Sequence, residues 1–257
     1  TLSLSSAASD VYKRQFQTIS DFGPDATRWY MISNSNPWDN LKFDLAGVDE
    51  VKRKFFGTLY NTYSFFALYA NIDGFKYDEK EIEFDQRPEL DRWILSELNS
   101  LIINVDEYYN DYEPTKAARA INSFVIDNLS NWYVRLSRRR FWKGDYEKDK
   151  ISAFQTLFDV LINIAKLSAP ISPFFMDRLF IDLSKNLNQR FSESIHLEDF
   201  PVADKSKIDK KLEEKVKYAQ TISSLTLSLR AKEKIKVRQP LSKILIPVNS
   251  SNQKEII

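Results

Sequence analysis

Long segments without proline, in which apolar side chains recur at every third or fourth position, most constrain how this 257-residue chain can fold. In residues 49–72 the apolar positions are Val51, Phe55, Leu59, Tyr63, Phe66 and Ala70. This spacing lines one face of an α-helix, and the same pattern predicts helices over residues 89–110, 113–142 and 148–167. Only 5 glycines and 9 prolines are available for turns, so we expect a mainly α protein, an antiparallel helix bundle.

Shorter patterns complete the prediction. We expect further helices over residues 24–33, 174–187 and 208–234, the last with the mixed Glu and Lys of a solvated face. The run Ile244-Leu245-Ile246-Pro247-Val248 predicts a strand. The bundle should therefore be followed by the start of a small α/β subdomain at the C-terminus.

Several kinds of site are excluded or disfavoured by what the sequence lacks. There is no cysteine, which excludes disulfides, thiolate zinc sites and cysteine nucleophiles and is compatible with a reducing cytosol. The single histidine, His196, lies in a short polar stretch and is interpreted as a loop residue. No glycine-rich phosphate loop is present, no carboxylates have metal-ligand spacing, and no apolar run reaches membrane-spanning length. We therefore expect no catalytic residue, no metal ligand and no membrane partner.

Residues 128–144 carry a concentration of positive charge. The segment holds Arg135, Arg138, Arg139, Arg140 and Lys143 and no acidic residue, although the chain as a whole is nearly neutral, with 37 basic and 36 acidic residues. Aromatic residues are interleaved with these cations, namely Trp132, Tyr133, Phe141 and Trp142. Cations for phosphates and flat rings for bases are what recognition of single-stranded RNA needs.

Helical spacing places most of this cluster on one side of its helix. The residues within about a third of the circumference are Asn131, Arg135, Arg138, Arg139 and Trp142. They lie beside the expected core stripe, which is Ile121, Val125, Leu129, Trp132 and Leu136. The alternative is a solvated basic helix end that favours the helix dipole. Five cations flanked by two tryptophans exceed what a dipole needs, so we favour an RNA-binding surface.

Three segments, taken in order, resemble isoleucyl-tRNA synthetase, a class I aminoacyl-tRNA synthetase. The first runs from Gly23-Pro24-Asp25 through Asn36-Pro37-Trp38-Asp39-Asn40-Leu41 and resembles the segment that follows the family's nucleotide-binding loop. The second is residues 124–142, with Asn128-Leu129-Ser130-Asn131-Trp132-Tyr133 and the arginine run. The third, Lys236-Val237-Arg238-Gln239-Pro240-Leu241, resembles the junction into the C-terminal subdomain.

The resemblance implies a domain organisation and a partner. Residues 16–46 would contact the tRNA stem, residues 47–206 would form the anticodon-binding helical bundle, and residues 207–257 would begin a truncated junction subdomain. Residues 1–15 resemble adaptor read-through and are expected to be a non-native leader. The partner would be isoleucine-accepting tRNA, not DNA, and the chain would be a monomer in the cytoplasm.

The resemblance also implies what this chain lacks. The family's two ATP-site signatures and its editing domain are absent from the sequence, so we expect a fragment that is inactive alone and holds no cofactor. The parent enzyme would activate isoleucine with ATP and Mg and charge tRNA. Two alternatives are the same region of a valyl-type synthetase and a helical protein-interaction scaffold with a basic patch.

Roles for individual residues follow from the same resemblance. Phosphates would be contacted by Arg135, Arg138, Arg139 and Lys143. A splayed base would stack on Trp142 or Phe141, and Asn131 belongs to the same face. Arg28 and Lys42 would line the inner side of the tRNA.

Overall fold

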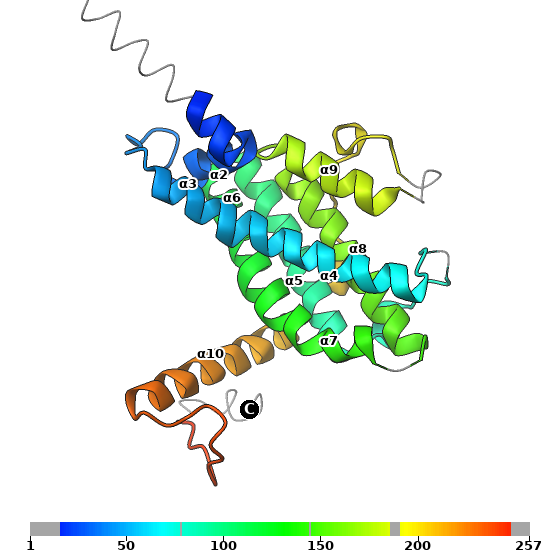
Figure 1. Ribbon diagram of the computed structural model, residues 1–257. Coiled ribbons are helices and arrows are strands. Elements are labelled where there is room, and N and C mark those ends of the chain that lie inside the picture. Colours follow the sequence, from blue (N-terminus) through cyan, green and yellow to red (C-terminus); the bar gives the residue numbers. More distant parts are fainter. Residues whose placement is uncertain (1–15, 78, 144, 186–190, 248–257) are drawn as a thin grey trace, which may run out of the picture. The chain divides into compact units, whose positions relative to one another are not determined.

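The computed structural model describes residues 16–77, 79–143, 145–185 and 191–247 (Figure 1). The expected leader, residues 1–15, lies outside the described residues. The chain divides into two compact units, residues 1–207 and residues 208–257. The expected boundary between residues 206 and 207 is one position away from this division.

The first unit is a bundle of helices, as the apolar spacing predicts. Its α-helices are α2 (Pro24–Asn34), α3 (Leu45–Val51), α4 (Gly57–Asp73), α5 (Glu89–Asn110), α6 (Pro114–Ser123), α7 (Arg135–Trp142), α8 (Lys148–Ser168) and α9 (Pro173–Ser184). Two π-helical segments, η1 (Lys52–Phe56) and η3 (Phe124–Val134), join α3 to α4 and α6 to α7 without a break. Short 3-10 turns lie at Phe84–Gln86, Ile195–Leu197 and Lys205–Lys207. The mainly α prediction is confirmed.

Proline and glycine set the ends of several helices. Pro24, Pro114 and Pro173 each occupy the first turn of a helix, where the missing backbone N–H is not needed. Gly74 ends α4 with φ of 72°, a left-handed conformation that glycine adopts without steric cost. The few breakers in the sequence therefore fall between helices and leave the long segments intact.

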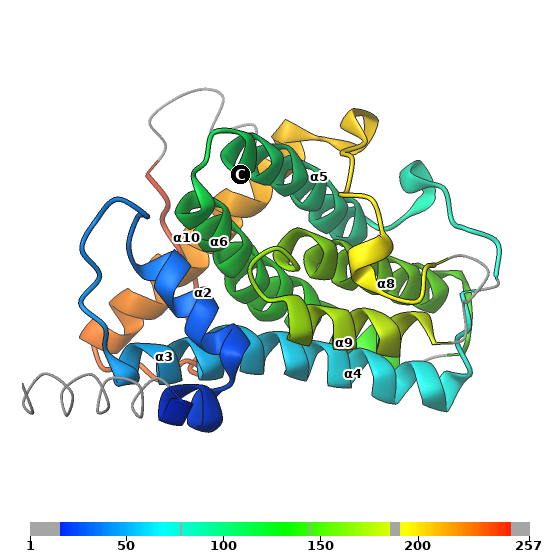
Figure 2. The same cartoon turned by 90° about the horizontal axis from the view of Figure 1, so that it is seen from above.

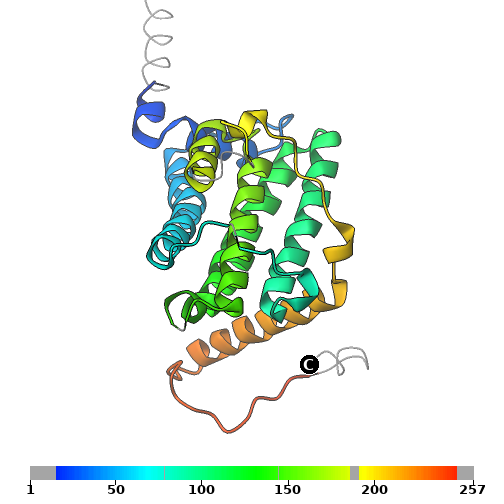
Figure 3. The same cartoon turned by 90° about the vertical axis from the view of Figure 1, so that its right-hand side faces the viewer.

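Helix α8 runs through the middle of the bundle and packs against α4, α5, α7 and α9 (Figures 2 and 3). It is long and apolar enough to cross a membrane, but 78% of its most apolar stretch is buried inside the bundle. Its rings join those of α4 and α7, for example Phe154 with Phe66 and Phe141. Burial of this kind identifies α8 as the core helix of the bundle.

The π-helical segment η3 changes which residues of the basic helix are buried. Trp132 is only half-buried and Leu136 is 55% exposed, so the expected core stripe is wrong at these two positions. Tyr133, Val134 and Ser137 are buried instead. Bonds from residue i to i+5 widen the turns of η3 and rotate every later residue around the axis relative to a regular α-helix.

The second unit contains α10 (Lys210–Lys232). After α10 the chain turns, and Arg230 donates hydrogen bonds from Nη1 to the carbonyls of Lys236 and Gln239, both at 2.9 Å. Residues 241–247 are irregular, and none of the described residues is in a strand. The expected strand is therefore wrong for residues 244–247, since no partner strand is present in the described part of the chain, and Val248 lies outside it.

Candidate nucleic-acid interface

A buried carboxylate holds the basic helix α7 against the bundle. Asp91, in the first turn of α5, is fully buried, and its two oxygens accept hydrogen bonds from Arg140 at 2.6 and 2.7 Å. The same carboxylate accepts from the Tyr133 hydroxyl at 2.9 Å and from the Ser152 hydroxyl at 2.6 Å. Arg140 also donates to Asp149 at the start of α8. Four elements thus meet at one carboxylate, which fixes the rotation of α7.

The charges in this network are matched. Burial disfavours the charged form of Arg140, but its hydrogen bonds to Asp91 and the attraction of that carboxylate raise the pKa of Arg140 above its ordinary value. Burial raises the pKa of Tyr133 well above its ordinary value, and the charge of Asp91 adds in the same direction. Arg140 therefore stays charged, Tyr133 stays a neutral donor, and neither is available to a ligand.

The other cations of the cluster point to solvent. Arg135, Arg138, Arg139 and Lys143 are exposed, and no ion pair joins any of them to another described residue. By contrast Arg53 and Lys54, on η1, pair with Asp49 and Glu50 one turn away. Unneutralised cations gathered on one rigid helix produce a local positive potential. The structure therefore brings together the predicted cations of α7 and separates Arg140 from them.

The two predicted stacking rings differ in exposure. Trp142 is 60% exposed at the end of α7, where a flat ligand can reach it. Phe141 is fully buried, with ring centroids 5.1 Å from Phe65 and 5.0 Å from Phe154. The prediction that Phe141 stacks on a base is therefore wrong, because its ring belongs to the bundle core.

The remaining predicted residues are spread over the bundle. Asn131 is exposed on η3, which leads directly into α7. Arg28 donates from Nε to the carbonyl of Ile171 at 2.8 Å, which ties α2 to the turn before α9. Lys42 is exposed on the loop between α2 and α3. Helix α2, which carries Arg28, and helix α3, which follows Lys42, lie at the N-terminal end of α4, whereas α7 lies beside the later part of α4 (Figure 1). Arg28 and Lys42 are therefore not brought together with the α7 cluster.

The residues that sequence reasoning missed are the partners of Arg140. Asp91 stands 49 positions before Arg140 in the chain, and Ser152 follows after a turn. One signal was available: Asp91 lies on the apolar stripe of its helix, next to Trp93 and Ile94, which are fully buried. A carboxylate at such a position requires a buried cation.

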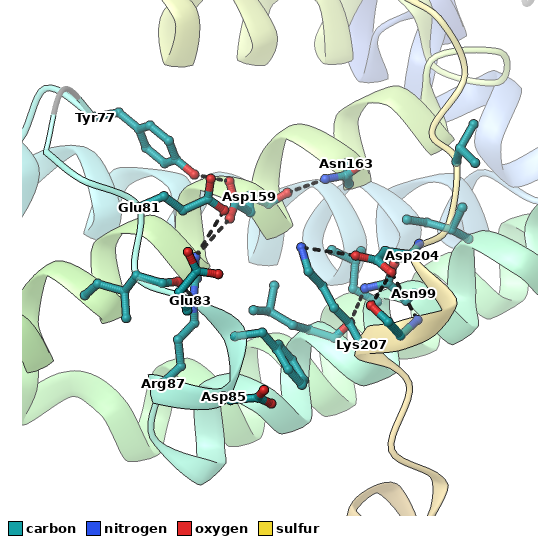
Figure 4. Close-up of a pocket in the computed structure, with 17 residues that line it drawn as sticks. Tyr77, Glu81, Glu83, Asp85, Arg87, Asn99, Asp159, Asn163, Asp204 and Lys207 are labelled. Carbon is teal, nitrogen blue, oxygen red and sulfur yellow. Dashed lines mark hydrogen bonds and ion pairs between the residues drawn. The ribbon is translucent and has the colours of Figure 1, made fainter.

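A cavity lies elsewhere in the bundle, between the connector before α5 and the segment that ends at Lys207 (Figure 4). It encloses about 650 Å³, and its carboxylates are Glu81, Glu83, Asp85, Asp159 and Asp204. Arg87 at its edge is buried and already bonded to Ile82 and Thr156, and Lys207 pairs with Asp204. An acidic rim repels a polyanion, so this cavity is not the nucleic-acid site.

No group of histidine and carboxylate side chains within the described ranges could hold a metal ion. His196 is exposed in a 3-10 turn, where its backbone N–H donates a hydrogen bond to the Ser194 hydroxyl. This is the loop position that its polar surroundings predict.

The bundle matches a known protein family. A model of the anticodon-binding domain of tRNA ligase matches residues 91–245. The chain belongs to this anticodon-binding family. The match begins at Asp91, the residue that anchors α7, and includes the whole basic cluster. The predicted resemblance to a tRNA synthetase is thereby confirmed.

Individual relatives are close. An isoleucine–tRNA ligase of Bacteroides thetaiotaomicron is 59% identical over 239 residues, which cover 93% of this chain and 21% of that protein. The isoleucine–tRNA ligase of Cytophaga hutchinsonii is 60% identical over 233 residues, again 21% of that protein. The chain therefore spans about a fifth of the length of these curated relatives.

The fold is also found in a solved structure of a class I synthetase. It is the ternary complex of agnB2 LeuRS, tRNA and LeuAMS from Agrobacterium radiobacter K84. It matches with a TM-score of 0.54 and 16% sequence identity over 76% of this chain and 21% of that one. At this identity the likeness concerns the fold alone.

Proposed function

We propose that this anticodon-binding domain holds the anticodon arm of isoleucine-accepting tRNA as part of an isoleucine–tRNA ligase. The observation that carries the proposal is the row of four exposed cations, three on α7 and Lys143 directly after it, none paired with another described residue. The names of the relatives support isoleucine over valine as the amino acid of the parent enzyme.

In this proposal each part of α7 has a separate task. Arg135, Arg138, Arg139 and Lys143 contact phosphates, whose charge they match in a region of positive potential. Trp142 stacks on an unpaired base, and Asn131 extends the same face along η3. Arg140 contacts no RNA, because its guanidinium is held by Asp91. Lys42 is a separate phosphate contact, and Arg28 serves mainly to fix α2.

The chemistry of the parent enzyme lies outside this chain. ATP and Mg would bind the catalytic domain of the ligase, and the domain described here would only position tRNA as a monomer in the cytoplasm. We accordingly expect no aminoacylation by the 257-residue chain alone.

The charge assignment is tested by replacing Arg135 and Arg139 with alanine. Each phosphate contact that is lost should lower the slope of log K against log salt by roughly 0.7–0.9. Fluorescence anisotropy with isoleucine tRNA at several salt concentrations measures both the affinity and this slope. We expect weaker binding and a slope reduced by roughly 1–2.

A matched control is available on η1. The double variant R53A/K54A removes two cations that are already paired with Asp49 and Glu50, so it should change the slope much less. If both double variants changed the affinity and the salt slope equally, RNA binding would depend on the net charge of the chain and not on the positions of Arg135 and Arg139. Titration with valine tRNA tests the amino-acid assignment, because a domain specific for isoleucine tRNA should bind valine tRNA less tightly than isoleucine tRNA.

A further inference from the structure

The side of α4 next to α7 carries large apolar side chains that the described residues leave exposed. Leu68 and Ile72 are 55% and 67% exposed, and they lie one turn apart on the same face of the helix. Tyr69, half-buried, sits beside them and packs on Phe65 with ring centroids 5.1 Å apart. Large apolar side chains grouped on a surface in this way mark a contact site more often than chance.

Contacts between the helices show that this side of α4 faces α7. Phe65 packs edge to face on Phe141 of α7, and Asp73, next to Ile72, pairs with Lys150 in the first turn of α8, the helix that follows α7. Figures 1 and 3 both show the C-terminal half of α4 beside α7. Leu68 and Ile72 therefore lie along the border between the two helices.

Helical geometry places the exposed ring of α7 on the same border. Arg140 leaves one flank of α7 towards α5, where it meets Asp91. Trp142 is two residues later and so emerges about 200° around the helix from Arg140, on the opposite flank. Phe141 lies between these two flanks of α7 and contacts Phe65 of α4 and Phe154 of α8. Since the flank of Arg140 is next to α5, the flank of Trp142 is the one next to α4. Arg138, one turn before Trp142, shares it.

We propose that Leu68, Tyr69 and Ile72 of α4, together with Trp142 and Arg138 of α7, form a subsite that takes an unpaired nucleotide of the bound RNA. The inference rests on the proposed function and adds a second wall to its site, made by a helix outside the residues matched by the family model. The base lies between Trp142 and the apolar side chains of α4, and Arg138 neutralises the phosphate.

Charge decides between RNA and a protein as the occupant. Arg138 has no ion pair with another described residue, and Arg135 and Arg139 are equally unpaired beside it. An apolar protein surface placed here would bury these guanidinium groups without partners, which is costly. A nucleotide supplies a flat apolar face and an anion at once, as stacking sites for single strands require.

The test compares two RNA probes bound by the 257-residue chain. One is a stem with an unpaired loop, and the other is a blunt duplex of equal length. The double variant L68S/I72S should weaken binding of the looped stem about tenfold, as the loss of one stacked base would. It should leave duplex binding and the salt slope unchanged, because no cation is removed.

Two further variants separate this effect from damage to the fold. L68M/I72M keeps the apolar surface and should bind the looped stem normally. L197S/V202S replaces apolar residues that are 63% and 91% exposed on the connector after α9, and it should have no effect. Because all four positions are exposed, each variant should melt near the temperature of the unchanged protein.

The failure of this inference is distinguishable from failure of the proposed function. If R135A/R139A weakens binding and L68S/I72S does not, the α4 subsite is wrong while the phosphate contacts stand. If L68S/I72S weakens looped and duplex RNA equally, the α4 face does not read an unpaired base, and the subsite is likewise overturned.

Discussion

Arg140 shows how one residue of a charge cluster can serve a different purpose from its neighbours. In the sequence it is the third of three consecutive arginines, and nothing local distinguishes it from Arg138 or Arg139. In the structure it is a bidentate partner of Asp91, with only 17% of its side chain exposed. The two arginines before it are exposed, whereas the third is held by the bundle.

Replacing Asp91 with asparagine tests this anchor. The variant removes the buried carboxylate partner of Arg140 and leaves only the exposed Asp149 as its counter-charge, which typically costs about 3 kcal/mol or more of the free energy of unfolding. Urea denaturation measures the change. The variant Y133F removes only one hydroxyl from the same carboxylate and should cost about 1 kcal/mol. Equal costs for the two variants would mean that the ion pair is not the main stabilising contact.

At the scale of the element, the π-helical segment η3 decides which side of the basic helix is free. A regular α-helix through residues 113–142 would bury Leu136 and present a different set of side chains to solvent. The wider turns of η3 bury Val134 and expose Leu136, and the four cations proposed to contact phosphates are all exposed. The proposed RNA site at the end of a π-helical segment agrees with the frequent occurrence of such segments at functional sites.

Serine substitutions at two neighbouring positions test this register. Leu136→Ser removes an exposed side chain and should change the free energy of unfolding by less than about 0.5 kcal/mol. Val134→Ser buries a hydroxyl in place of an apolar group and should cost about 1–3 kcal/mol. Chemical denaturation of both variants under the same conditions gives the comparison. The opposite order of costs would indicate a regular α-helix through this segment.

At the scale of the whole molecule, the sequence predicts the helices better than the contacts between them. The periods of apolar residues locate α5 at residues 89–110 and the six other predicted helical segments to within a few residues, because each pattern is local. The burial of Phe141 and the pairing of Asp91 with Arg140 depend on packing between distant segments, which local periods do not contain. Residues 244–247 are irregular although their apolar pattern predicts a strand, because apolar β-branched residues favour strands only where a partner is present.

The division of the chain after Lys207 leads to a prediction about the bundle alone. The buried apolar residues of the described chain belong to residues 1–207, with Leu212 as the exception. A chain ending at residue 207 should therefore keep the cooperative unfolding transition of the bundle, with a free energy of unfolding changed by less than about 1 kcal/mol. Circular dichroism during urea titration follows this transition, and anisotropy with the looped RNA follows the site. Because α4 and α7 both lie in the retained unit, the effects of R135A/R139A and L68S/I72S should persist in it. A broad, non-cooperative transition would mean that the second unit is needed for the bundle to fold.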